Sequence, residues 1–264
     1  MAEATMSGGR RDGESSAAGL DTGTPRPARS AVMTSSRSYG QNCSLARAMD
    51  LLGERWTVLI VRELARGPKR FGDLNDGLTG IGTTMLAARL KRLEAADVIT
   101  RAEPGTGATG YHLTPRGERL AHALGDLMLW GLDLPDMYHS DDQSRAVWLA
   151  MNMHAALRRA AHPAPAGTYA FHVDDEHFWL HVPDGAPSTL RDGTPPYPPD
   201  ATLTLTTADF YSLAVGTPLS DLATAVADGD QDRLAQLVVL FGHIEPGSGD
   251  TITPKEVTRA TRRH

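Results

Sequence analysis

One segment, residues 83–96, joins an apolar face to a face whose side chains suit contact with a nucleic acid. Leu86, Leu90 and Leu93 recur at spacings of four and three residues, which predicts one buried side of a helix. At about 100° per residue, the opposite side and its flanks carry small side chains and cations: Thr83, Thr84, Ala87, Ala88, Arg89, Lys91 and Arg92. Such a helix can lie in a major groove with its N-terminal residues nearest the bases.

The types of these side chains suggest distinct contacts. Threonine methyl groups and alanine can meet thymine methyl groups, which places Thr83, Thr84 and the two alanines at base edges. Lys91 and Arg92 lie farther along the helix and suit phosphates, whereas Arg89 suits either the DNA backbone or a structural partner within the chain. The alternative is that Lys91 and Arg92 are only a solvated helix face.

The elements around this segment predict a winged helix-turn-helix. The expected order is helices at 44–52, 55–65, 71–78 and 83–96, strands at 98–102 and 111–113, and a helix from 114 to 132. Gly80-Ile81-Gly82 predicts a tight turn, and Thr114 followed by Pro115 predicts a capped helix start. Two short helices joined by a glycine turn and followed by a hairpin are what this motif requires.

Four sequence blocks in this region resemble HxlR-type transcriptional regulators, which are MarR-like winged-helix proteins. The blocks are residues 43–64, 67–74, 80–94 and 111–117. The match covers about residues 40–132, and we place the domain at residues 40–134. The resemblance implies a homodimer that binds palindromic operators in double-stranded DNA. The sequence departs from the family pattern at the hairpin tip, where relatives often carry basic residues and this chain carries none. Arg101, at the base of the hairpin, is the nearest cation.

The helix that begins near residue 115 is apolar nearly all round. Leu120, Leu124 and Leu127 recur at helical spacing, and Leu129 and Trp130 extend the apolar surface to other sides. One side can pack on its own domain, and the remainder predicts a dimer interface together with helix 44–52. The alternative is burial under the C-terminal part of the chain.

Cys43 is the only cysteine, which excludes an intrachain disulfide framework and a Cys-rich zinc site. It precedes a predicted helix start, where partial positive charge favours the thiolate, and Arg47 lies one turn later. The resemblance adds that some relatives sense oxidants or electrophiles through a cysteine at this place. The alternative is a small apolar side chain with a structural role.

Residues 143–244 predict a separate α+β domain. The expected elements are a helix at 143–160, strands at 168–174, 176–182 and 202–206, short helices at 209–215 and 219–226, and an amphipathic helix at 231–241. Residues 200–241 resemble a sterol-carrier-protein-type domain, which implies an apolar tunnel and an apolar small-molecule ligand. The side chains expected to line it are Phe171, Phe178, Phe210, Leu213, Leu237 and Phe241. The alternative is an ordinary filled core.

Charge separates the two parts of this 264-residue chain, whose formal net charge is −6. Residues 40–133 carry 12 basic and 11 acidic side chains, whereas residues 140–244 carry 5 and 13, giving +1 and −8. The first part therefore stays compatible with nucleic acid. No apolar run reaches the roughly 18 residues that cross a bilayer, so we expect a cytoplasmic protein with no membrane partner. Residues 1–38 and 245–264 are predicted to be disordered or flexible tails.

Three histidines, His172, His177 and His181, could together suggest a metal-binding site, but their spacing along the predicted strands argues against it. His177 and His181 lie roughly 13 Å apart along one strand, too far for one ion. No phosphate loop, nucleophile elbow or acid–base pair is evident, so we expect no metal, no cofactor and no catalysis. The leading interpretation is a dimeric DNA-binding regulator modulated by an apolar ligand. The alternatives are a lipid-carrying or protein-interaction module whose winged helix is a scaffold, and a regulator that senses thiol-reactive compounds through Cys43.

Overall fold

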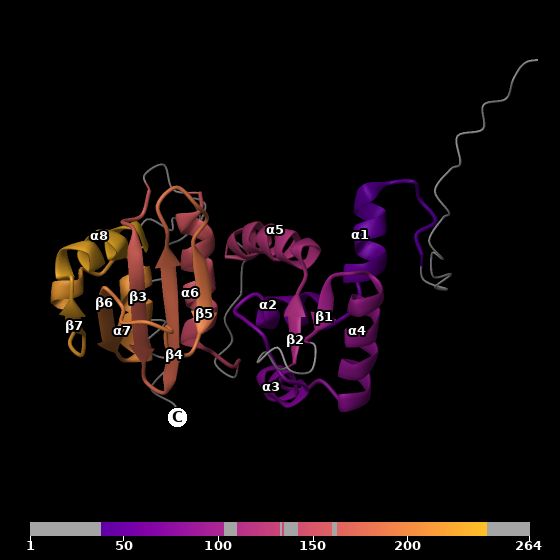
Figure 1. The fold of residues 1–264 in the computed structure, drawn as a ribbon, viewed down its shortest axis with the longest axis horizontal. Helices are drawn as coiled ribbons and strands as arrows, with labels where there is room; N and C mark the ends of the chain where they lie inside the picture. Colours follow the sequence, from indigo (N-terminus) through magenta and orange to yellow (C-terminus); the bar gives the residue numbers. More distant parts are fainter. Residues whose placement is uncertain (1–37, 103–109, 133, 135–141, 160–162, 242–264) are drawn as a thin grey trace, which may run out of the picture. The chain divides into compact units, whose positions relative to one another are not determined.

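The computed structural model describes residues 38–102, 110–132, 134, 142–159 and 163–241, with only the backbone of Phe241. The first part contains α1 (Ser44–Leu52), α2 (Thr57–Leu64), α3 (Phe71–Gly77), α4 (Thr83–Ala95), β1 (Ile99–Arg101), β2 (Tyr111–Leu113) and α5 (Pro115–Gly131). Helices α3 and α4 form the helix-turn-helix and β1 and β2 form the wing (Figure 1), so the predicted winged fold is confirmed. The predicted tails lie outside the described residues, apart from Ser38.

The predicted apolar face of α4 is what anchors this helix. Leu86, Leu90 and Leu93 are almost completely buried and join the core of the winged part. The turn before α4 contains Gly80, whose φ of +91° favours glycine. A Cβ at this glycine would lie 3.7 Å from the ring of Trp56, so the indole packs against the turn.

Trp56 also explains why α2 begins at Thr57 instead of the predicted residue 55. Its φ of 80° is left-handed, a conformation that a regular helix cannot continue through. At the start of α5 the prediction is confirmed: the Thr114 hydroxyl accepts a hydrogen bond from the Gly117 N–H at 3.1 Å, and Pro115 occupies the first turn.

A third stretch of backbone completes the wing. Lys69 donates its N–H to the Tyr111 carbonyl at 3.0 Å and accepts from the Tyr111 N–H at 2.8 Å. Gly110 precedes this pairing with a φ of +96°, and a Cβ there would lie 2.2 Å from the Lys69 carbonyl oxygen. Only glycine fits at this close approach.

The second part is an α+β unit, as predicted. It contains α6 (Ala146–Leu157), β3 (Gly167–Val173), β4 (Glu176–Val182), β5 (Thr189–Asp192), β6 (Ala201–Leu205), α7 (Thr207–Ala214), a 3₁₀ turn (Leu219–Asp221), β7 (Val226–Gly229) and α8 (Gln231–Phe241). The strands form one sheet in the order β5-β4-β3-β6-β7, in which β3 and β6 are parallel and the other pairs antiparallel. Helices α6, α7 and α8 cover one face of this sheet (Figure 1).

Two predicted details of this part are wrong. The expected helix at 219–226 is a single 3₁₀ turn, because Leu222 has an extended backbone and Val226 begins β7 against Thr204. The sequence predicts no strand between residues 182 and 202, yet Thr189–Asp192 forms an edge strand on β4. Four residues are too few to show an alternating pattern in sequence.

Among the described residues, no helix combines the length and the apolar character needed to span a membrane.

Candidate functional site

Helix α4 presents a continuous exposed face made of the residues that the sequence predicts at DNA. Thr83, Thr84, Ala87, Ala88 and Lys91 are all exposed. The leucines on the other side fix the rotation of the helix, because burying them turns these five side chains outward. The structure therefore brings the predicted base-contacting residues and Lys91 onto one surface.

Arg89 and Arg92 belong to a different environment. Arg89 donates to Glu54 at 2.7 Å, and Arg92 contacts the same carboxylate at 3.3 Å. Arg92 also donates to the backbone carbonyl of Asp50. Both side chains are mostly buried at the corner between α1 and α2, so their charges tie α4 to that corner. Of the two roles that the sequence allows for Arg89, the structure shows the contact with a structural partner, Glu54. Arg92 was expected to contact a phosphate, and it instead contacts the same carboxylate.

Arg101 stands at the base of the wing. Its side chain is 69% exposed, lies 4.8 Å from the centroid of the Tyr111 ring and donates to the Tyr111 hydroxyl. Its guanidinium also comes within 3.8 Å of Glu94. Tyr111 therefore positions this cation next to the wing, whose tip at residues 103–109 lies outside the described residues.

Sequence reasoning did not single out Met85, which is 42% exposed beside Thr84 at the start of α4. The available signal was that Met85 is a large apolar residue that falls outside the spacing of Leu86, Leu90 and Leu93. It adds a flexible apolar side chain to the exposed face.

The HxlR-like helix-turn-helix family model matches residues 51–137. The HTH-type transcriptional regulator YvaP of Bacillus subtilis is 36% identical over 92 residues, which cover 34% of this chain and 85% of that protein. This chain belongs to the HxlR-like helix-turn-helix family. The HTH-type transcriptional regulator YodB of B. subtilis is 38% identical over 85 residues, which cover 31% of this chain and 76% of YodB.

Two solved structures are also similar to parts of this HxlR-like chain. The crystal structure of quinone-bound YodB has 33% identity and a TM-score of 0.32, covering 35% of this chain and 99% of that one. Sterol carrier protein 2 from Yarrowia lipolytica, in its apo form, has 16% identity and a TM-score of 0.27, covering 45% of this chain and 86% of that one.

Helices α1 and α5 of the HxlR-like part expose large apolar side chains. Leu45 on α1 is 67% exposed and Trp130 on α5 is 60% exposed, and Met49 of α1, Leu127 of α5 and Leu134, which follows α5, are also exposed. These two helices are the ones that the sequence predicts at a dimer interface. Surfaces on which large apolar side chains gather are typical of protein–protein interaction sites.

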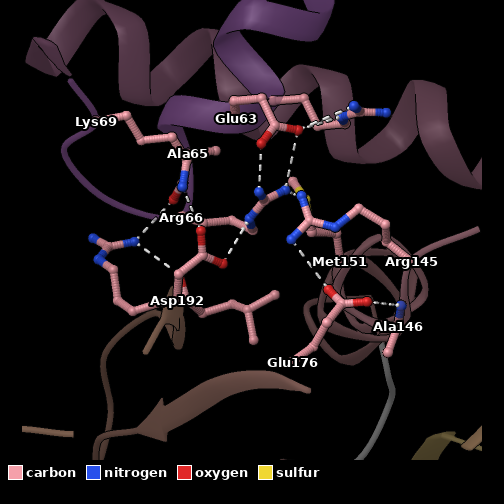
Figure 2. A network of polar contacts seen from close by, with 12 residues as sticks. Glu63, Ala65, Arg66, Lys69, Arg145, Ala146, Met151, Glu176 and Asp192 are labelled. Carbon is pink, nitrogen blue, oxygen red and sulfur yellow. Dashed lines mark hydrogen bonds and ion pairs between the residues drawn. The ribbon is translucent and has the colours of Figure 1, made fainter. Parts of the chain in front are cut away.

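The C-terminal end of α2 carries a buried network of charges that sequence reasoning missed. Glu63 and Arg66 form an ion pair whose side chains are each 1% exposed, and Arg62 reaches the same carboxylate at 3.0 Å. Arg66 also contacts Asp192 of β5 at 2.8 Å, and Lys69 binds the second oxygen of that carboxylate (Figure 2). The network therefore joins α2 directly to the C-terminal sheet.

Further polar contacts accompany this network. The Arg191 guanidinium donates to the Ala65 carbonyl at 2.9 Å, and the Asp192 N–H donates to the Arg66 carbonyl at 3.1 Å. Arg62 lies 4.3 Å from the centroid of the Trp148 ring on α6. We refer to this set of contacts, from Arg62, Glu63, Ala65, Arg66 and Lys69 to Trp148, Arg191 and Asp192, as the α2–β5 boundary.

The predicted ligand-lining residues of the C-terminal part pack on one another. Phe171 and Phe178 are cross-strand neighbours with ring centroids 5.4 Å apart, and Phe210 of α7 meets both rings edge-on. Leu213 and Leu237 are buried in the same cluster, whereas the side chain of Phe241 lies outside the described residues. A water-sized sphere finds only about 10 Å³ of room here, which is space for about one water.

Cys43 is exposed at the residue before α1. The backbone N–H groups of Ala46 and Leu45 at the start of α1 lower the pKa of its thiol. This is the electrostatic environment that the sequence predicts for the position.

Two of the three histidines in the sheet lie side by side on neighbouring strands, which their spacing in the sequence did not predict. His172 and His177 are directly opposite each other on β3 and β4, with ring centroids 4.7 Å apart. His181 instead faces Thr168 at 2.9 Å. Within the described residues, no group of three or more His, Cys, Asp or Glu side chains is arranged to hold a metal ion.

Proposed function

We propose that this protein is a homodimeric transcriptional regulator that reads a palindromic site in double-stranded DNA through α4. The observation that carries the proposal is the exposed face of Thr83, Thr84, Ala87, Ala88 and Lys91, held outward by three buried leucines. Family membership supports it, since the curated relatives named above are HTH-type transcriptional regulators.

Each side chain on this face has a distinct role in the proposal. Thr83, Thr84, Ala87 and Ala88 meet base edges, where methyl groups favour thymine. Lys91 neutralises a phosphate and sets the helix in the groove. Arg101 at the wing base approaches the backbone beside the groove, with Tyr111 holding its guanidinium.

The test measures binding to the promoter region of the protein's own gene across a range of salt concentrations. Lys91→Ala is expected to weaken binding to all sequences and to reduce the slope of log affinity against log salt by about one. Thr84→Ala is expected to change sequence preference while leaving that slope unchanged. Arg159→Ala, an exposed cation on the C-terminal part, is the matched control. Absence of promoter binding at any salt concentration would overturn the proposal.

The proposed dimer uses the exposed apolar surfaces of α1 and α5. A recognition helix in each protomer then meets successive half-sites about one turn of DNA apart. Trp130→Glu is expected to give a monomer in analytical ultracentrifugation, because a charge cannot be buried unpaired at such an interface. Val239→Glu changes an equally exposed apolar residue of α8 and should leave the oligomeric state unchanged.

A ligand bound in the C-terminal part completes the proposal. The sequence places an apolar ligand among Phe171, Phe178 and Phe210, where it has to displace packed side chains. A ligand shifts DNA binding only if it prefers one of two conformations. Phe210→Asp is expected to abolish any response of DNA binding to an apolar ligand. An unchanged response in a folded variant would exclude this location.

Thiol chemistry at Cys43 is a second candidate for regulation. The observation that favours it is the exposed thiol with a lowered pKa. Cys43→Ser separates the two forms of regulation. Loss of every inducer response in this variant would support the thiol, and an intact response to an apolar ligand would support the C-terminal part.

A further inference from the structure

A second cavity lies where the winged part meets the C-terminal part, and it is larger than the space in the sheet core. It offers about 80 Å³ and is lined by residues of α2, α5, α6 and β5. Leu124 and Met128 of α5 and Met151 of α6 supply apolar walls. His122 and Arg158 also line it and are exposed, so the cavity opens to solvent on their side.

The charges around this cavity are unbalanced. Four arginines line it, namely Arg62, Arg66, Arg158 and Arg191, against one carboxylate, Glu118. Arg62 and Arg66 already form ion pairs, both with Glu63 and the second also with Asp192. Arg191 donates to the carbonyls of Ala65 and Leu190, and no carboxylate of the described residues forms an ion pair with Arg191 or Arg158.

His154 lines the same cavity, among its cations. Its Nε2 lies 3.0 Å from the Ser188 hydroxyl and 3.1 Å from the Ser188 carbonyl. Burial lowers its pKa to about 4, and the neighbouring charges of Arg158, Arg191 and His122 act in the same direction. The ring is therefore neutral at physiological pH, and a negative charge near it would favour its protonated form.

We propose that this cavity binds a small organic carboxylate, whose charged group pairs with Arg158 and Arg191 and whose apolar body lies against Leu124, Met128 and Met151. The planar fork of a guanidinium matches a carboxylate with two parallel hydrogen bonds. A dry cavity of about 150 Å³ is enough for benzene, so about 80 Å³ with an open side fits a short chain or part of a ring.

The position of the cavity gives the ligand a route to the DNA-reading part. Two of its walls, α2 and α5, belong to the winged helix-turn-helix, and the other two, α6 and β5, belong to the C-terminal part. A ligand that bridges these walls favours the arrangement in which they fit it. This regulatory consequence rests on the proposed function, whereas binding of the carboxylate does not.

The test uses the full chain without DNA and titrates it calorimetrically with hexanoate, with hexanamide as the neutral probe of the same shape. Hexanoate is expected to bind at least about tenfold more tightly, because a charge-assisted hydrogen bond is worth more than a neutral one. Arg158→Gln is expected to remove this difference. Arg159→Gln is the matched control, since Arg159 is the next residue and does not line the cavity.

A second measurement locates the ligand. Bound hexanoate is expected to raise the pKa of His154. A pH titration followed by NMR of the imidazole ring measures this pKa, and the His154→Gln variant identifies which NMR signal belongs to His154. Ala121→Leu fills the cavity from α5 and is expected to abolish hexanoate binding even if Arg158→Gln proves unstable. Equal binding of hexanoate and hexanamide, or an unshifted His154, would overturn the proposal. DNA binding is measured separately, so its absence would refute the regulator and leave this site standing.

Discussion

Helices α2 and α4 belong to the same winged helix-turn-helix, yet they use charged side chains in opposite ways. Helix α4 leaves small residues and Lys91 exposed, and its two arginines turn back to Glu54. At the C-terminal end of α2, by contrast, Glu63 is buried against Arg66, which lies just after the helix and contacts Asp192. The C-terminal part therefore contacts the winged part at the end of α2 and along α5, and the predicted DNA-contacting face of α4 stays exposed.

The largest effect is expected at the α2–β5 boundary. Arg66→Ala leaves Glu63 buried with only Arg62 as a partner, so the free energy of unfolding should fall by about 3–5 kcal/mol. Urea unfolding measures the change, and Arg62→Ala is the control because Arg62 is more exposed and shares the same carboxylate. A loss below about 1 kcal/mol for Arg66→Ala would mean that the boundary does not hold α2 to the C-terminal part.

Acid should weaken the same region through His154. The folded chain holds its pKa near 4, below the ordinary value of 6.5, so between these values the unfolded chain binds a proton that the folded chain excludes. The free energy of unfolding therefore falls as pH falls through this window, by at most about 3 kcal/mol. His154→Gln should flatten the pH dependence of urea unfolding relative to the unchanged protein, and identical slopes would contradict the prediction.

The wing tests how closely the two regions are linked, because Lys69 pairs with both Tyr111 and Asp192. Gly110→Ala forces a Cβ against the Lys69 carbonyl at a positive φ and should cost about 2 kcal/mol or more. Gly72→Ala is the control, since a Cβ there meets nothing within 4 Å. Equal thermal stability of the two variants would show that the wing is not constrained by Lys69.

The smallest effect separates the two cations of α4. Arg92→Gln weakens contacts to Glu54 and Asp50 and should lower the free energy of unfolding by about 1 kcal/mol, with little change in the salt dependence of DNA binding. Lys91→Gln should do the reverse, lowering the salt slope by about one with unchanged stability. If Arg92→Gln changes the slope as much as Lys91→Gln does, Arg92 contacts phosphate as the sequence suggests.

Features set by local periodicity and capping were predictable from the sequence. The leucine spacing of α4 identifies its buried face, and Thr114-Pro115 marks the start of α5. Arg92 was misplaced because a helical wheel shows which way a side chain points and not that Glu54 lies next to it. Short strands such as β5 carry no period that can be recognised.

The α2–β5 boundary could not be found from sequence for a related reason. Glu63 and Arg66 are three residues apart near the end of a predicted helix, a spacing usually interpreted as a surface ion pair. Their burial depends on Asp192, and no local pattern connects residues so distant in the chain. The same applies to His172 and His177, whose pairing follows from the register of β3 and β4.

The separation of Arg66 from Asp192 has a consequence for how the chain emerges from the ribosome. The two residues are 126 positions apart, and translation adds about 5–20 residues per second. The winged part, whose last helix ends at Gly131, is therefore complete about 3–12 seconds before Asp192 is made. Glu63, one helical turn away, pairs with Arg66 during that interval, so the nascent domain does not present an isolated cation on an apolar surface.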